Sequence, residues 1–321
     1  MGGFLDELGK KLADRWLQLL VLPGALYLAV AIAARTLGQS RPVDLHWLTT
    51  QVIAWAKTPA ATSVGGQVVL LAAALAGATA AGLAAQALGS LIERLTLAAG
   101  WSGWKPPLRQ LAGKRVDDRR RRWDAQHATY SRLYHHALND GQLALKDDDL
   151  GPAGQAEKAE RYAAYGARTR IAPERPERPT WTGDRINAVD VRLKRDLHLN
   201  LPAVWAGLWL TFPGPARTEI TAARQALASA ATLTAWAVLY MILAGLWWPA
   251  ALIAIILAVS GWHRTRAGAD AYATLLEAST RLYARDLARH LGVDHGQSLD
   301  QQTGDSLTAT LRSVPPPAPE S

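Results

Sequence analysis

The stretch from Ala226 to Trp262 constrains this chain most, because it carries no charged residue and is apolar almost throughout. The tetrapeptide Leu246-Trp247-Trp248-Pro249 interrupts it near the middle. The 20 residues from Leu227 to Leu246 would form a helix about 30 Å long, which matches the hydrocarbon core of a bilayer. We therefore predict a transmembrane hairpin over residues 226–262.

The returning arm of this hairpin, from Ala250 to Trp262, is short for a full span. Arg264 and Arg266 follow it, and long basic side chains can extend from a helix end to the lipid headgroups. The indole rings of Trp247 and Trp248 suit the same depth, because they combine an apolar body with a polar N–H. Arg264 and Arg266 are therefore candidate contacts with anionic lipid.

Two further spans are predicted within residues 16–96, the first from Trp16 to Leu37 and the second from Val68 to Leu91. Residues 1–15 carry apolar and basic side chains on opposite helical faces, which predicts an amphipathic helix on the cytoplasmic surface. A secretory signal is the alternative for the first span, since Ala31-Ile32-Ala33 imitates a cleavage site. The long apolar run and the acidic residues before it argue against that alternative.

Small residues recur every four positions in the second span, at Gly77, Ala81, Ala85 and Gly89. Such a row lets helix backbones approach closely, and close packing drives helix association in lipid. We expect these four residues to pack against other helices of the same chain. A homo-oligomer interface is the alternative.

Basic residues are distributed unevenly between the segments that flank the spans. The outer segment carries only Arg41 and Lys57, and Asp44 can cap an interfacial or lid-forming helix over residues 44–57. The segment Thr96–Arg224 carries 22 of the 35 lysines and arginines. The positive-inside rule therefore predicts that this segment and both termini are cytoplasmic. Abundant alanine and an excess of arginine over lysine indicate a high-GC bacterial genome, and hence the bacterial inner (cell) membrane.

Residues 97–225 are predicted to form a basic helical cytoplasmic domain. Helices are expected at 116–138, 156–167 and 183–197, with an extended linker at 171–179 and a flat interfacial helix at 202–212. Residues 263–292 are predicted to form a helical stalk with an apolar stripe that can pack on the helix Trp123–Leu138. The stripe consists of Tyr272, Leu275, Leu276, Leu282, Tyr283, Leu287 and Leu291. Residues 293–321 end in a proline-rich run and are predicted to be a disordered tail.

Short motifs in the second half of the chain resemble a known family. They are Pro179-Thr180-Trp181-Thr182-Gly183-Asp184, Leu197-His198-Leu199-Asn200, Trp205-Ala206-Gly207-Leu208 and Phe212-Pro213. Their order is similar to that in an uncharacterised family of bacterial four-span membrane proteins. That family has a Pro-Thr-x-x-Gly-Asn segment, then a Tyr-Gly-Leu-Asp-like segment, then a Trp-Pro-Arg-Leu segment before the last hairpin. The chain departs from this pattern at Asp184, Leu197-His198 and Ala206-Gly207. The resemblance covers about residues 179–291 and implies membrane topology with a shared juxtamembrane element, but no activity.

Several classes of chemistry are excluded or disfavoured by residue content. The absence of cysteine excludes disulfides, cysteine zinc sites and thiol catalysis, and no nucleophile-elbow, P-loop or dinucleotide motif is present. His127, His135 and His136 lie near one another, followed by Asn139 and Asp140, but helical spacing does not direct the histidines to one point. We therefore predict no metal site and no cofactor. An enzyme stays open only through a site that no motif marks.

Four consecutive arginines, Arg119, Arg120, Arg121 and Arg122, lie beyond the second span in a chain of net charge +8. A basic run close to a membrane can bind anionic lipid headgroups, each residue contributing about 1 kcal/mol. A protein partner is a second possible ligand, and a solvated helix face is the alternative. No nucleic acid is expected, because no aromatic stacking platform accompanies the run.

The sequence thus predicts an all-α, four-transmembrane-helix protein with a helical cytoplasmic domain and a C-terminal helical stalk. The leading hypothesis is a membrane anchor or scaffold that presents the basic domain to protein partners or anionic lipid. The alternative is an oligomeric channel or pore. That alternative is weakened because the predicted spans carry almost no ionisable residues, which usually mark ion pathways.

Overall fold

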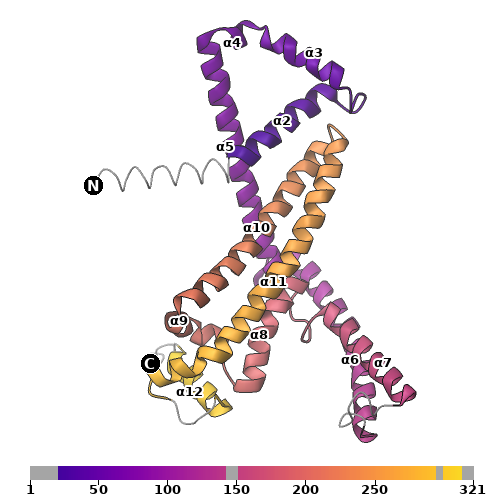
Figure 1. Ribbon diagram of the computed structural model, residues 1–321, viewed down its shortest axis with the longest axis vertical. Helices are drawn as coiled ribbons and strands as arrows, with labels where there is room; N and C mark the ends of the chain where they lie inside the picture. The colour runs from indigo at the N-terminus through magenta and orange to yellow at the C-terminus, as the bar shows by residue number, and fades with distance from the viewer. Residues whose placement is uncertain (1–20, 142–150, 294–298, 313–321) are drawn as a thin grey trace. The chain divides into compact units, whose positions relative to one another are not determined.

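A computed structural model describes residues 21–141, 151–293 and 299–312 (Figure 1). Every regular element within these ranges is helical and none is a strand, which confirms the all-α prediction. The predicted helix over residues 1–15 and the start of the first span lie outside the described residues. The chain divides into two compact units: unit 1 comprises the residues up to Glu93 together with Ala226–Thr265, and unit 2 comprises Arg94–Gln225 and the residues from Arg266 onward.

Unit 1 consists of apolar helices. Its elements are α2 (Leu22–Leu37), α3 (Leu45–Ala56), α4 (Pro59–Thr62), most of α5 (Val64–Leu97), the second part of α10 (Gly214–Ala244) and the first part of α11 (Pro249–His290). Asp44 caps α3 as the sequence predicts, because its carboxylate accepts a hydrogen bond from the Trp47 backbone N–H at 2.8 Å. Ala34, Ala85 and Trp236 belong to a buried apolar cluster formed by α2, α5, α10 and α11.

The turn between α10 and α11 spans residues 245–248, as the Trp-Trp-Pro sequence predicts. The last carbonyl groups of a helix have no partner within it. Here the Gln39 side chain donates to the carbonyl oxygens of Ala244 and Gly245 at 3.0 and 3.1 Å. Its own carbonyl accepts from the Trp248 N–H at 3.2 Å. The connection after α2 therefore holds the tip of the α10–α11 hairpin.

Two helices, α5 and α10, are long and apolar enough to cross a bilayer, by length and composition. In their most apolar windows only 17% of α5 and 44% of α10 is buried. The described part of the first predicted span is the 16-residue α2, and the apolar part of α11 ends near Trp262. Length and composition thus support two spans in the described chain, and not the four that the sequence predicts.

Unit 2 contains the charged helices. Its further elements are η2 (Trp101–Gly103), α6 (Leu108–Asn139), α7 (Pro152–Ile171), α8 (Trp181–Leu197), α9 (Leu201–Thr211) and α12 (Gln301–Leu311). The predicted helices at 116–138, 156–167 and 183–197 are confirmed within α6, α7 and α8. Leu193, Leu208 and Leu307 are fully buried in its core.

The helix predicted at 202–212 is α9 (Leu201–Thr211), and one of its faces belongs to the core of unit 2. One face of α9 carries Val204 and Leu208, both with no exposed surface, and its other face leaves Leu210 78% exposed. Because the sequence is apolar on both faces of this helix, it could not predict which face packs inside unit 2.

The tail predicted to be disordered over 293–321 is helical between Gln301 and Leu311. Asp300 caps this helix by accepting from the Thr303 N–H at 2.8 Å, and Leu307 is fully buried against α8 and α9. Gly304 lies so close to the Leu197 carbonyl that a Cβ there would stand 1.7 Å from its oxygen. The prediction was wrong here because a single buried leucine and close backbone contact hold the helix. The proline-rich residues from 313 onward lie outside the described residues.

The stalk helix ends near its predicted boundary, but its predicted packing partner was wrong. Leu276 and Leu287 of α11 pack into the cluster formed with α8, α9 and α12, whereas Leu282 is 67% exposed. The helix α6 packs along α7 instead, where Tyr130 and Tyr165 have ring centroids 5.5 Å apart (Figure 1).

Candidate functional site

The four consecutive arginines of α6 do not form one basic surface. Successive residues of a helix point about 100° apart, so the run surrounds the helix. Arg121 and Arg122 are exposed and lie 3.6 and 2.5 Å from Asp118. Arg120 donates to the Pro176 carbonyl at 2.8 Å. Arg119 is buried, so the prediction that it contacts lipid or a partner is corrected.

Arg119 forms a buried ion pair with Asp184 at 2.6 Å and donates to the Ile171 carbonyl at 2.7 Å. The other carboxylate oxygen of Asp184 accepts from the backbone N–H groups of Glu177 and Arg178 at 2.9 and 2.8 Å. Burial raises the pKa of Asp184, and the hydrogen bonds from the two N–H groups and Arg119 oppose that rise. The pair joins α6, the end of α7 and α8.

The segment before α8 caps the end of α5. The carbonyls of Thr96 and Leu97 accept hydrogen bonds from Thr180 Oγ1 at 2.5 Å and from the Arg178 guanidinium at 3.1 Å. A Cβ on Gly183 would stand 2.5 Å from the Leu97 oxygen. The Pro-Thr-x-x-Gly-Asp segment therefore has a structural role. Its glycine permits close contact with the last backbone carbonyl of α5, and its aspartate forms the ion pair with Arg119.

The two arginines after the hairpin have different surroundings. Arg264 is exposed in unit 1. The Arg266 guanidinium lies over the Trp181 ring, 4.1 Å from its centroid, within unit 2. Arg264 thus keeps the exposure that a headgroup contact needs, whereas Arg266 has a cation–π partner inside the chain.

The small residues of α5 contact other helices of unit 1. Ala85 and Gly89 are buried, and Gly77 and Ala81 are partly buried. A Cβ on Gly89 would stand 3.0 Å from the Thr232 backbone, and one on Gly77 would stand 2.9 Å from the Leu28 side chain. The row therefore serves packing within the chain against α2 and α10, the use that the sequence analysis favours.

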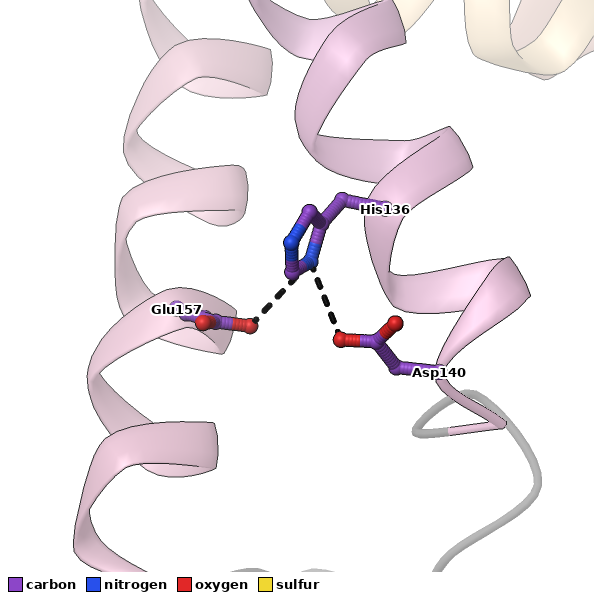
Figure 2. Close-up of side chains that lie close together, drawn as sticks. All are labelled: His136, Asp140 and Glu157. Carbon is purple, nitrogen blue, oxygen red and sulfur yellow. Dashed lines mark ion pairs between the residues drawn. The ribbon is translucent and has the colours of Figure 1, made fainter.

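The candidate histidines separate into different environments. His127 stacks on Trp123 and lies 3.1 Å from Arg168, and His135 is exposed. His136 lies between two carboxylates (Figure 2). Its Nδ1 is 3.2 Å from Asp140 Oδ2 and 3.7 Å from Glu157 Oε2.

Sequence reasoning weighed His136 and Asp140 but missed Glu157. His136 and Asp140 are four residues apart on α6, a spacing that brings side chains together on one helical face. Glu157 belongs to α7, and its approach depends on the register of the α6–α7 packing. Helical periodicity predicts both helices but contains no information on that register.

Two neighbouring cavities of about 290 and 240 Å³ lie in unit 2 and share Trp205 and Tyr272. Arg178 and Asp190 line the first, and Arg224 lines the second. Their walls mix indole and phenol rings with ionised groups of both signs, without a convergent set of ligands.

A comparison with family models, curated proteins and solved structures finds no match to this chain. The resemblance to bacterial four-span membrane proteins therefore stays a prediction. The class that the fold defines is an all-helical protein with two candidate membrane-spanning helices.

Proposed function

We propose that this protein is a multi-pass membrane anchor or scaffold of the bacterial cell membrane that presents unit 2 to cytoplasmic partners. The observation that carries the proposal is the exposure of apolar side chains along α5. Val68, Val69 and Leu71 are each more than 60% exposed. Burial of one large apolar side chain stabilises a fold by about 1.5–3 kcal/mol, and in water each of these exposed side chains would lack that stabilisation. A lipid environment removes that penalty.

The burial of α5 argues against a soluble core helix. A core helix of a soluble protein is covered on most sides, whereas the apolar window of α5 is only 17% buried. The side of α5 that is covered carries small residues such as Ala85 and Gly89, and the exposed side carries the larger ones. This distribution suits a helix that packs on its neighbours through small residues and faces lipid with large ones.

In the four-span arrangement α11 also crosses the membrane, and its exposed apolar side chains support this. On α11, Leu252, Ile255 and Ile256 are each more than half exposed. The arm from Pro249 to Trp262 would cover only about 21 Å at 1.5 Å per residue, so the bilayer thins or Arg264 extends to the headgroups. With four spans, the positive-inside rule predicts cytoplasmic termini and a cytoplasmic unit 2.

The partner is a protein or the anionic lipid surface itself. Arg121 and Arg122 supply exposed positive charge on α6, although Asp118 partly neutralises them. An oligomeric channel is the alternative function. The small-residue row that motivates it has contacts with α2 and α10 inside the chain, which favours the anchor.

The first experiment is alkaline carbonate extraction of bacterial membranes that contain the full chain, followed by purification with and without detergent. The protein should stay in the membrane and need detergent to remain monodisperse. A monodisperse protein in plain buffer would overturn the proposal.

The second experiment crosslinks the full chain in its native membrane and identifies captured proteins and lipids. Wild type should capture a stoichiometric protein or enriched anionic lipid, and Arg121→Glu with Arg122→Glu should reduce the capture. Arg132→Glu, at an exposed arginine elsewhere on α6, is the control for a single charge reversal and is compared with Arg121→Glu alone. Ion flux through reconstituted liposomes without any captured partner would favour the channel instead.

A further inference from the structure

Three side chains of types that can bind a metal ion lie close together where the C-terminal end of α6 meets the first part of α7. His136 and Asp140 come from α6 and Glu157 from α7, and Figure 2 shows the imidazole between the two carboxylates. One ligand atom from each residue lies within 4.8 Å of the others. All three side chains are accessible from solvent, since their exposed fractions are 62%, 46% and 41%.

The distances fit a divalent transition metal. Zinc bonds to imidazole nitrogen and carboxylate oxygen are about 2.0–2.2 Å long, so donors in a tetrahedron lie roughly 3.3–3.6 Å apart. The two separations from His136 Nδ1, 3.2 and 3.7 Å, bracket this range. The ligand oxygens of Asp140 and Glu157 lie within 4.8 Å of each other.

The convergence on one nitrogen is informative. An Nδ1–H group can donate one well-directed hydrogen bond, and the Glu157 oxygen at 3.7 Å lies beyond hydrogen-bond range. A metal ion bound to the Nδ1 lone pair instead has room for both carboxylates. The carboxylates of Asp140, at the end of α6, and Glu157, on α7, therefore both lie near the position that a metal ion on Nδ1 would occupy.

The electrostatic surroundings favour a cation. Asp140 is the C-cap of α6, where the helix dipole presents its negative end. Glu160 lines the adjoining cavity of about 310 Å³, which also contains His136 and Glu157. Arg132 is the opposing positive charge in that lining. Within this set the carboxylates outnumber the guanidinium, and the cavity leaves space for water in the remaining coordination positions.

We propose that His136 Nδ1 and the carboxylates of Asp140 and Glu157 bind a divalent transition metal of the zinc class. Histidine and carboxylate ligands suit such ions, and three protein ligands leave an open position for water or a partner's ligand. The metal fastens the end of α6 to α7. This inference does not depend on the membrane proposal, because all three residues belong to unit 2.

The test titrates Zn²⁺ alone into the full chain in detergent, purified with a tag that contains no histidine. Isothermal calorimetry should detect one site in wild type. Loss of an outer-shell partner typically weakens metal binding about 10–100-fold. His136→Gln and Glu157→Gln remove ligands, so each should weaken this site at least about tenfold. His135→Gln is the matched control, because His135 is the adjacent exposed histidine, and it should bind as wild type does.

A second readout guards against variants that fail to fold. Zn²⁺ should slow amide hydrogen exchange around residues 136–140 and 157 in wild type, because a ligand that binds only the folded state stabilises it. Asp140→Asn should lose this protection while its circular dichroism stays unchanged. The proposal is overturned if wild type binds no zinc. It is also overturned if zinc binds but the ligand variants and His135→Gln bind it equally well.

Discussion

Unit 1 and unit 2 are both helical, but they are held together by different interactions. In unit 1, helices approach through small residues, as where Gly89 meets Thr232 and Gly261 meets Thr234. In unit 2, helices are joined by ion pairs such as Arg119–Asp184 and Arg281–Asp196. The described ion pairs concentrate in unit 2.

This difference is the one expected if lipid surrounds unit 1 and water surrounds unit 2, as proposed above. Water stabilises a fold by driving apolar groups inward, and exposed ion pairs are compatible with it. In lipid the hydrophobic drive between helices is lost, so close backbone packing has to replace it. The contrast predicts that ionic substitutions affect unit 2 and steric substitutions affect unit 1.

The largest expected effect comes from Arg119→Met. Removing one partner of a buried ion pair leaves an uncompensated charge and destabilises by about 3–5 kcal/mol, so unit 2 should lose that stability at pH 7. The pKa of Asp184, already raised by burial, should rise further without Arg119. A folded-state pKa above the unfolded value means that the folded state binds the proton first as the pH falls. Stability lost at pH 7 should therefore partly return under acidic conditions.

Hydrogen exchange of the full chain in detergent measures this loss for α6 and α8 separately from α5. Arg121→Met is the matched control in the same arginine run, and it should change stability by no more than about 0.5 kcal/mol because Arg121 is exposed. Equal effects of the two substitutions would contradict the buried role of Arg119.

The next largest effect tests whether the C-terminal helix belongs to unit 2. Leu307→Ala should destabilise unit 2 by about 2–5 kcal/mol, because the side chain is fully buried and its removal leaves a cavity. Chemical unfolding in detergent measures the change. Leu282→Ala, at a leucine 67% exposed on α11, is the matched control and should have little effect. If both variants unfold alike, α12 contributes nothing to the core.

The corresponding test in unit 1 is steric. Gly89→Leu should destabilise the α5–α10 contact by about 1–3 kcal/mol, since its Cβ alone would stand 3.0 Å from the Thr232 backbone. Thermal unfolding in detergent micelles measures the effect. Gly65→Leu on the same helix has open space around it and should be tolerated. An intact α5–α10 contact in Gly89→Leu would remove the argument that small residues hold unit 1 together.

Local features of the fold could be predicted from the sequence. The Asp44 cap, the turn at Trp247–Pro249 and the helix that became α8 follow from short-range patterns of capping residues, proline and apolar spacing. Helix-to-helix pairing could not be predicted, because the same apolar stripe of α11 fits several partners. That is why α6 was wrongly chosen in place of α8, α9 and α12.

One signal in the candidate site was present but overlooked. Val116, Arg119 and Trp123 are spaced at i, i+3 and i+7, so Arg119 lies on the buried stripe of α6. That spacing separates it from the exposed Arg121 and Arg122. Glu157 carried no comparable signal, since only the packing of α7 on α6 brings it to His136.

The smallest expected effect concerns pH. The hydrogen bond from Arg281, with a further contribution from Arg195, lowers the pKa of Asp196 below its usual value. A depressed folded-state pKa means that the pair stabilises unit 2 above the unfolded pKa and that this contribution is lost as the pH falls through the folded value. Because both side chains are more than a third exposed, water screens the pair, and its contribution to stability is no more than about 1 kcal/mol.

Asp196→Asn should therefore reduce the difference in unfolding free energy between pH 7 and pH 3, and added salt should reduce the wild-type difference. Since unit 1 is held by steric contacts, the protection factors of α5, which are exchange rates corrected for the intrinsic pH dependence of amide exchange, should not follow this pH dependence. If they did, the division between an ionic unit and a steric unit would fail.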